Sequence, residues 1–124
     1  MKIEYIHEGS SDCPLIRIYE FQNNEIDNLY SIISELAERK NNSAALHDLS
    51  FMNTIENCRL TFYVDEDDRG IAISQDKNFE CRLTRDSWFR VMDLVAPFKN
   101  DIDGFQWLDE EGPVSLLLSK DGKW

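Results

Sequence analysis

The chain has 124 residues, 42% of them hydrophobic and 11% aromatic, which is enough to build one domain around a single core. Its 24 acidic and 13 basic residues give a formal net charge of −11, which disfavours contact with nucleic-acid backbones and anionic membranes. No apolar run approaches the roughly 20 residues that a membrane-spanning helix needs, and the mixed polarity of Met1 to Glu4 is unlike a signal peptide. We therefore expect a single cytoplasmic α+β domain over residues 1–124.

The first part of the chain predicts a hairpin followed by an amphipathic helix. Apolar residues recur in Lys2 to Glu8 and in Cys13 to Phe21, and Gly9 to Asp12 between them has the composition of a turn. Asn23 or Asn24 is suited to cap the helix, because its side chain can accept a hydrogen bond from a free amide of the first turn. The predicted apolar face repeats at helical spacing and comprises Ile26, Leu29, Tyr30, Ile33, Leu36 and Ala37.

Three strands are predicted in the middle of the chain, after a weakly patterned segment from Ala44 to Asn57. Cys58 to Val64 alternates apolar and polar residues, Ile71 to Ser74 continues the alternation, and a polar turn over residues 76–78 leads into a strand that begins at Phe79. Short turns between successive strands favour an antiparallel meander.

The clearest structural signal is the segment from Phe79 to Phe98, which predicts a strand that leads directly into a helix. Apolar residues alternate up to Leu83, and Thr84 is suited to cap the helix. Pro97 ends the helical pattern, because the residue before a proline is pushed away from helical angles. The apolar face of this helix comprises Trp88, Val91, Met92 and Val95.

A second hairpin is predicted near the end of the chain, from Phe105 to Leu108 and from Val114 to Leu118. Because neighbouring strands are mostly joined by short turns, the whole pattern predicts one mainly antiparallel sheet of about 6–8 strands. Both amphipathic helices should cover one face of this sheet, as in a two-layer sandwich. Leu108 and Leu117 give the hairpin apolar character on both faces, which suits either full burial or association with a second copy.

The tetrapeptide Cys-Arg-Leu-Thr occurs in both the first and the third strand of the predicted meander. Its flanks differ, so we interpret it as two strands of one sheet in similar surroundings. If the leucines face the core, Arg59 and Arg82 share the opposite sheet face with Tyr63. That face is a candidate site for an anionic ligand, and the simpler interpretation is a cross-strand ion pair with Glu80.

Acidic residues cluster in three of the predicted turns, and two of these turns hold the candidate partner-binding residues. The residues concerned are Asp65, Glu66, Asp67 and Asp68 in one turn and Asp109, Glu110 and Glu111 in another. The first turn begins like a calcium loop, but Arg69 stands at its fifth position and Asp76 replaces the bidentate glutamate at its twelfth. We interpret both turns as solvated, and their acidic residues are the candidate partner-binding residues.

The sequence contains no recognisable pairing of a nucleophile with a base. His7 and His47 lie outside any catalytic motif, and Cys13, Cys58 and Cys81 are widely spaced. Strand phase turns the last two cysteines inward, where thiols are usually inert. Metal-ligand spacings and phosphate-binding glycine loops are also missing from the sequence. We therefore expect a non-catalytic protein with reduced thiols, no metal and no cofactor.

Three functions remain as alternatives. The first is a protein-interaction domain whose acidic surface binds a basic protein, and in size, charge and layout the chain resembles bacterial proteins that neutralise basic toxins. The second is a ligand-binding domain or enzyme that holds a small anion at Arg59, Tyr63 and Arg82. The third is a homodimer formed through the C-terminal hairpin. We expect the first, because strong negative charge is combined with the lack of a catalytic motif.

Overall fold

The computed structural model describes residues 1–75 and 77–124. Asp76, which belongs to one predicted turn and to the rejected calcium loop, lies outside the described residues. Within them the helices are α1 (Asn23–Ala37) and α2 (Arg85–Val95). The strands are β1 (Lys2–Ile6), β2 (Leu15–Tyr19), β3 (Ser43–Ala45), β4 (Asn53–Thr54), β5 (Arg59–Val64), β6 (Gly70–Gln75), β7 (Asn78–Leu83), β8 (Phe105–Asp109) and β9 (Ser115–Ser119).

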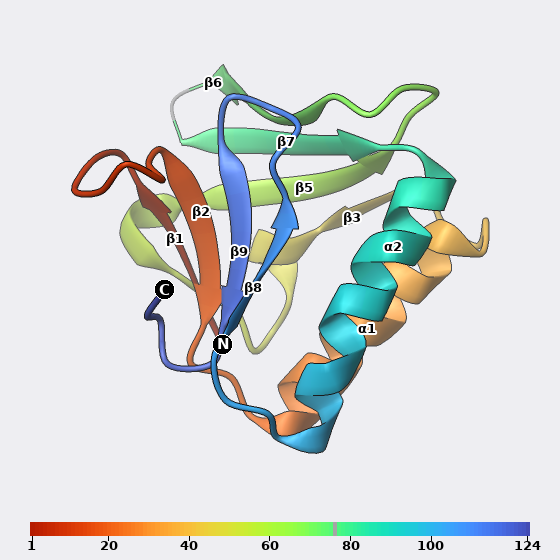
Figure 1. Ribbon diagram of the computed structural model, residues 1–124. Helices are drawn as coiled ribbons and strands as arrows, with labels where there is room; N and C mark the ends of the chain where they lie inside the picture. The colour runs from red at the N-terminus through yellow and green to blue at the C-terminus, as the bar shows by residue number, and fades with distance from the viewer. Residues whose placement is uncertain (76) are drawn as a thin grey trace.

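The strands form two sheets instead of the single predicted sheet. One sheet has the order β4-β1-β2-β9-β8 and the other has the order β3-β5-β7-β6. Both are mixed, because β1–β4, β2–β9 and β5–β7 are parallel pairs and the other pairs are antiparallel. Figure 1 shows the two sheets running across each other, with α1 and α2 side by side along one side of them. The α+β class with two helices is thus confirmed, and the single, mainly antiparallel sheet is replaced by two mixed sheets.

The predicted meander is wrong in its strand order, because β7 lies between β5 and β6. β5 and β7 pair in parallel, with Leu60 opposite Phe79 and Phe62 opposite Cys81. Both of these strands bury alternate residues, whereas the last four residues of β6 are exposed. β6, which has the most exposed residues of the three strands, occupies the sheet edge, where it has one full neighbour. The two Cys-Arg-Leu-Thr strands lie in one sheet, as predicted, but they are direct neighbours, which the meander did not predict.

Both predicted helices bury the face that their spacing indicates. α1 begins after Gln22, the residue before the two predicted asparagine caps, because Glu25 reaches back and accepts from the Gln22 backbone N–H at 2.8 Å. Thr84 caps α2 as predicted, and its hydroxyl accepts from the Ser87 N–H at 3.2 Å. The buried helix residues are Ile26, Leu29, Ile33, Leu36 and Ala37 in α1 and Ser87, Trp88, Val91 and Val95 in α2.

Buried residues from both sheets and both helices form one continuous cluster. At its centre the ring of Phe62 in β5 packs against the ring of Trp88 in α2, with 4.6 Å between their centroids. The indole Nε1 of Trp88 donates to the Tyr63 carbonyl at 3.0 Å, so this polar group is satisfied inside the core. α2 is thereby fixed against the four-stranded sheet.

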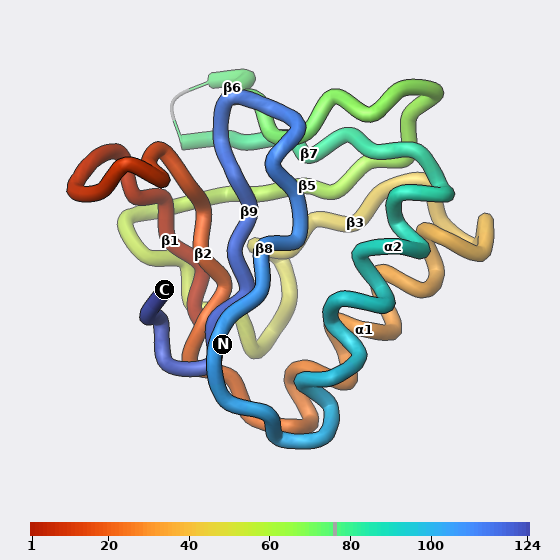
Figure 2. The backbone as a smooth tube through the Cα atoms, viewed as in Figure 1, coloured from red at the N-terminus to blue at the C-terminus, as the bar shows by residue number. Residues whose placement is uncertain are grey.

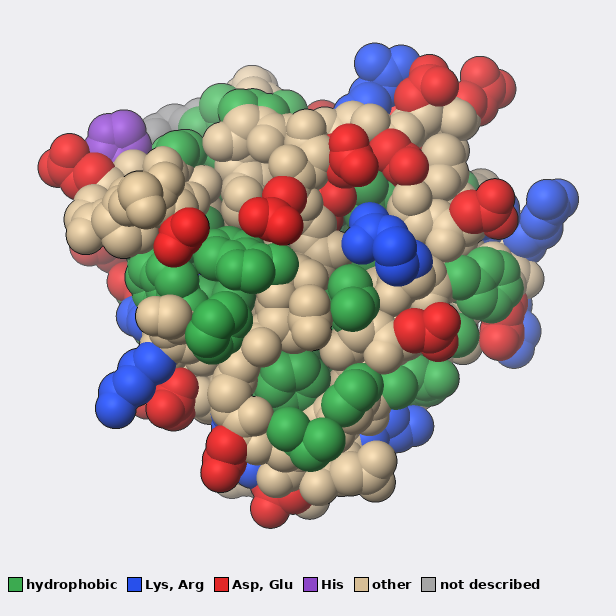
Figure 3. Space-filling model, in the orientation of Figure 1, with side chains coloured by type: hydrophobic (Ala, Val, Ile, Leu, Met, Phe, Trp, Pro, Cys, Tyr) green, Lys and Arg blue, Asp and Glu red, His purple; other side chains and the backbone are tan. Residues whose placement is uncertain are grey.

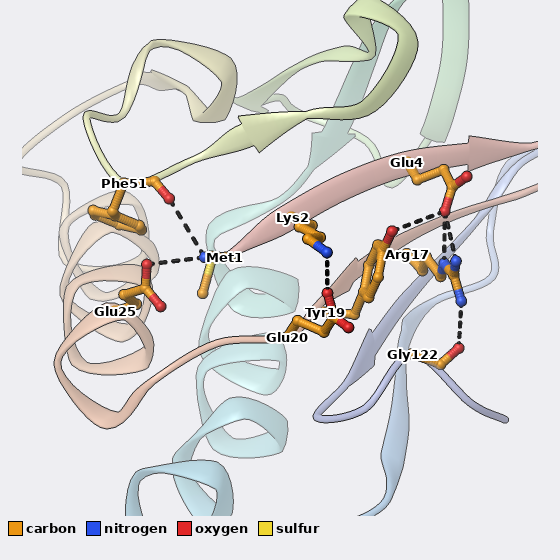
Figure 4. A network of polar contacts seen from close by, with 9 residues as sticks. All are labelled: Met1, Lys2, Glu4, Arg17, Tyr19, Glu20, Glu25, Phe51 and Gly122. Carbon is orange, nitrogen blue, oxygen red and sulfur yellow. Dashed lines mark hydrogen bonds and ion pairs between the residues drawn. The ribbon is translucent and has the colours of Figure 1, made fainter.

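Polar contacts fasten Met1 and the segment 120–124 to the rest of the molecule (Figure 4). The buried amino group of Met1 lies 2.9 Å from Glu25 Oε2. On the outer face of the five-stranded sheet, Arg17 donates to Glu4 Oε1 and to the Gly122 carbonyl, each at 2.6 Å. Figure 2 shows the segment 120–124 turning back from β9 to lie beside β2 and β1. This segment thus covers part of the outer sheet face.

Candidate functional site

The two acidic turns that are separate in the sequence meet in the structure. Residues 65–69 follow β5, and residues 110–114 connect β8 to β9. The turns touch through glycine backbone, because a Cβ atom added to Gly70 would lie only 2.2 Å from the Gly112 nitrogen. Next to this contact, Ile71 and Val114 form an antiparallel bridge. We call the exposed carboxylates of the two turns that do not bond to the start of α2 the acidic junction, and they are Glu66, Asp67, Glu110 and Glu111.

Two of the predicted acidic residues serve the fold. The Glu66 backbone N–H, 2.6 Å from Asp65 Oδ1, and the Arg69 guanidinium lower the pKa of Asp65. Asp68 accepts from the Thr84 N–H at 2.8 Å and from the Ser87 hydroxyl at 2.7 Å. Burial raises the pKa of Asp68, but these donors outweigh it and bring the pKa below its ordinary value. Asp68 therefore secures the start of α2.

Asp109 is turned into the molecule and is only 2% exposed. Its Oδ2 accepts from the Glu111 backbone N–H at 3.3 Å, and its Oδ1 has no hydrogen-bond partner among the described residues. Burial raises the pKa of Asp109, and the nearby charges of Glu111 and Asp68 act in the same direction, while Arg90 opposes them. A protein partner cannot reach this carboxyl group from outside.

The acidic junction contains four of the predicted partner-binding residues. All four of its carboxylates are exposed, and within the described residues the one ion pair among them joins Asp67 to Arg69 at 3.5 Å. Figure 3 shows acidic side chains gathered over the upper part of the molecule, around the start of α2 and the β8–β9 turn. Arg90, which acts on both Asp68 and Asp109, is exposed. Within the described residues, this surface therefore carries several carboxylates that form no ion pair.

On the outer face of the four-stranded sheet, the two arginines of the predicted anion site lie apart from each other. The Arg82 guanidinium stacks over the Tyr63 ring at 4.2 Å and lies 3.5 Å from Glu80 and 3.8 Å from Asp65. Arg59 is four residues from Tyr63 along β5, which separates the two arginines by about 13 Å. Arg59 lines a hollow of about 290 Å³ together with Tyr63 and Glu80. Arg82 does pair with Glu80, but both residues lie in β7, so this contact is not the predicted cross-strand ion pair.

Another surface hollow has a volume of about 770 Å³ and carries charges of both signs. Its charged lining residues are Arg39, Asp65, Glu66, Arg82, Arg85 and Asp86. Arg85 is engaged by the fold, because it donates to the Leu36 carbonyl at 2.6 Å and to Asn42 Oδ1 at 2.9 Å. Arg82 is engaged by Tyr63 and by its two carboxylate partners. Two of the three arginines in this hollow are therefore already engaged within the protein.

A second hollow, of about 480 Å³, lies between β8 and the segment 120–124. We call it the aromatic hollow, and it is lined by Ser10, Asp12, Phe105, Trp107, Gly122, Lys123 and Trp124. Figure 3 shows hydrophobic side chains gathered in this region, with acidic side chains beside them. Sequence reasoning missed this feature because three distant segments build it. The available signal was the presence of two aromatic residues on one face of the last hairpin and a third aromatic residue at Trp124.

The Cys58 and Cys81 thiols are poorly suited to act as nucleophiles. Burial raises the pKa of the Cys58 thiol to about 12 and that of the Cys81 thiol well above its ordinary value. His47 Nδ1 lies 3.2 Å from the Leu60 carbonyl, and His7 lies 3.5 Å from the Tyr5 hydroxyl. Over residues 1–75 and 77–124, no three His, Cys, Asp or Glu side chains converge as a metal site would require. In the same residues, neither helix has the length and apolar character to cross a bilayer.

Comparison with known proteins identifies no relative from which these residues could take a role. No protein-family model, no curated protein sequence and no solved structure matches the chain.

Proposed function

We propose that this chain is a non-catalytic protein-interaction domain whose acidic junction binds a basic protein. The main support for this proposal is that two acidic turns, separated by about forty residues of sequence, are held against each other by the Gly70–Gly112 contact. Glu66, Glu110 and Glu111 project from this place without an ion-pair partner among the described residues. A protein partner that brings lysine or arginine to this surface would neutralise them.

Electrostatics favours such a partner over other classes. With a formal net charge of −11, the surface attracts cationic proteins over a distance of about one Debye length, roughly 8–10 Å at physiological salt. Attraction of this kind raises association rates and rejects anionic partners, including nucleic acid. The same charge opposes a homodimer, because a second copy brings equal negative charge to the interface.

The anionic-ligand alternative has weaker support. Arg82 is already neutralised by Glu80 and Asp65, and an anion would have to displace at least one of these carboxylates. Arg59 lies too far along β5 to act with Arg82 on one small ligand. Catalysis by Cys58 or Cys81 is opposed by their raised pKa values. We further propose a cytoplasmic location, which suits three free cysteines.

The proposal is tested by reversing charge at two matched places. One variant carries Glu66→Lys, Glu110→Lys and Glu111→Lys, and a control carries Asp27→Lys, Glu38→Lys and Asp93→Lys at exposed positions in the two helices or directly after α1. Each reversal adds two charges, so both triple variants move from −11 to −5. Calorimetric titration with purified basic proteins from the native cell should show binding that the junction variant weakens by about tenfold or more.

The control variant should keep the affinity of the unaltered chain within about threefold. Equal weakening in both triple variants would mean that overall charge, and not the acidic junction, governs binding. If no basic protein binds the unaltered chain at low ionic strength, the proposed function is wrong.

A further inference from the structure

The aromatic hollow has the walls of a binding site for a cationic side chain. Phe105 and Trp107 project from the outer face of β8, with their ring centroids 6.5 Å apart and their planes at 79°. Trp124 belongs to the opposite wall. Phe105 is 47% exposed and Trp124 is 37% exposed, so the ring surfaces are accessible from outside. Exposed aromatic rings around an open hollow are typical of sites that recognise another molecule.

The wall formed by residues 122–124 is held in place before any partner arrives. The Gly122 carbonyl accepts from Arg17 at 2.6 Å, and the Lys123 carbonyl accepts from the Ser119 hydroxyl at 2.6 Å. The Trp124 indole N–H donates to Asp12 Oδ2 at 3.2 Å. These three contacts fix the segment at successive residues. A preformed wall lowers the entropy that a ligand must lose on binding.

We infer that the aromatic hollow accepts an arginine side chain of the basic partner. This inference rests on the proposed function. The guanidinium plane can stack on Trp107 or Trp124, and its N–H groups can reach Asp12, whose Oδ1 makes no hydrogen bond among the described residues.

Charge complementarity selects this occupant over the other candidates. A purely apolar side chain would leave Asp12 without a cation, and an anionic group would face both Asp12 and a chain of net charge −11. Lysine matches the charge but lacks the planar group that stacks on an indole. Lys123 is the one basic residue in the lining, and its exposed ammonium opposes a second cation. Replacing Lys123 should therefore strengthen arginine binding.

The test uses the indole N–H signals of the full chain in a two-dimensional ¹⁵N NMR titration. The probe is a blocked pentapeptide, Gly-Ser-Arg-Ser-Gly, and its matched control contains citrulline, which has the shape of arginine without the charge. The Trp107 and Trp124 signals should shift and saturate with the arginine peptide. The signal of Trp88, which is fully buried and hydrogen-bonded to Tyr63, provides the internal reference and should stay unchanged. Citrulline should bind at least about tenfold more weakly.

Variants then locate the site. Phe105→Ala and Trp124→Ala should each weaken arginine binding by about tenfold or more. Phe89→Ala, which removes a similarly exposed aromatic ring from α2, should leave it unchanged. Lys123→Ala should strengthen binding by a few-fold.

Equal affinity for citrulline and arginine, or unmoved Trp107 and Trp124 signals, would overturn the inference. In that case the proposed function still stands if charge reversal at the acidic junction weakens binding of the basic protein. If the indole signals respond to arginine but no basic protein binds, the proposed function fails while the hollow remains an arginine site.

Discussion

At the scale of single residues, the buried carboxyl group of Asp109 stands in an unfavourable environment. Its carboxyl group is buried, one of its oxygens is unpaired, and its charge also raises the pKa of the neighbouring Cys81 thiol. Gly70 passes close by, because a Cβ atom there would lie 2.9 Å from Asp109 Oδ2. Ionised aspartate is unfavourable in such a place. Ionised Asp109 therefore lowers the stability of the fold near neutral pH.

Asp109→Asn should stabilise the fold at pH 7 by about 1 kcal/mol, because it removes a buried charge and keeps the side-chain shape. The pKa of Asp109 is raised in the folded state, so the unfolded chain loses this proton at lower pH. The folded state is therefore disfavoured as pH rises from the ordinary aspartate value through the folded pKa. Urea unfolding at several pH values should show a gain that vanishes below about pH 4. A gain of the same size at pH 3 would indicate better packing instead of a removed charge.

At the scale of elements, the start of α2 depends on a turn that looks in the sequence like a plain acidic run. Asp68 accepts hydrogen bonds from the Thr84 N–H, the Thr84 hydroxyl and the Ser87 hydroxyl. Thr84 in turn caps the helix by accepting from the Ser87 N–H. The turn between β5 and β6 is thereby tied to the helix that follows β7. Asp68 thus supports the fold, whereas its neighbours Glu66 and Asp67 belong to the acidic junction.

Asp68→Ala should destabilise the fold by about 1–2 kcal/mol, because it leaves the capping network without its acceptor. The matched variant Asp67→Ala, one residue earlier and exposed, should change stability by less than about 0.5 kcal/mol. The pKa of Asp68 is lowered in the folded state, so its stabilisation is present at neutral pH and is lost as pH falls through the folded pKa. Urea unfolding of both variants measures the difference. Equal effects would show that Asp68 does not act through α2.

At the scale of the whole molecule, the two sheets are joined where β6 meets the β8–β9 turn. The bridge between Ile71 and Val114 links the four-stranded sheet to the five-stranded sheet. It is possible because Gly70, with φ +73°, and Gly112 bring their backbones into contact. The contact between Gly70 and Gly112 also places the two acidic turns side by side. The same glycine contact therefore supports both the assembly of the sheets and the proposed binding surface.

Gly70→Ala should destabilise the fold by about 3 kcal/mol or more, because its methyl group would collide with the Gly112 backbone and alanine is strained at positive φ. Gly104→Ala is the matched control, since Gly104 also has positive φ, +102°, but has open space around its Cβ position. The control should lose only about 1–2 kcal/mol, from backbone strain. Thermal unfolding followed by circular dichroism compares the two. Similar losses would mean that the glycine contact is not required to join the sheets.

The sequence by itself determined the elements that depend on local patterns. Helical spacing located both helices, alternation located the first and last hairpins, and Thr84 marked the start of α2, because these signals lie within one turn or one strand. Burial of the Phe79 strand followed from the same alternation. Strand order did not follow, since it depends on which distant elements pack against β5, β6 and β7.

Only the tertiary structure decided which candidate residues belong together. The sequence contained both acidic turns, but it could not show that Asp109 turns inward, that Asp68 supports α2, or that two glycines bring the turns into contact. The aromatic hollow likewise combines residues 10–12, 105–107 and 122–124. Local periodicity fixes which side of an element faces the core, whereas the packing of distant elements fixes which exposed side chains become neighbours. For this chain, the packing of distant elements defines both proposed sites.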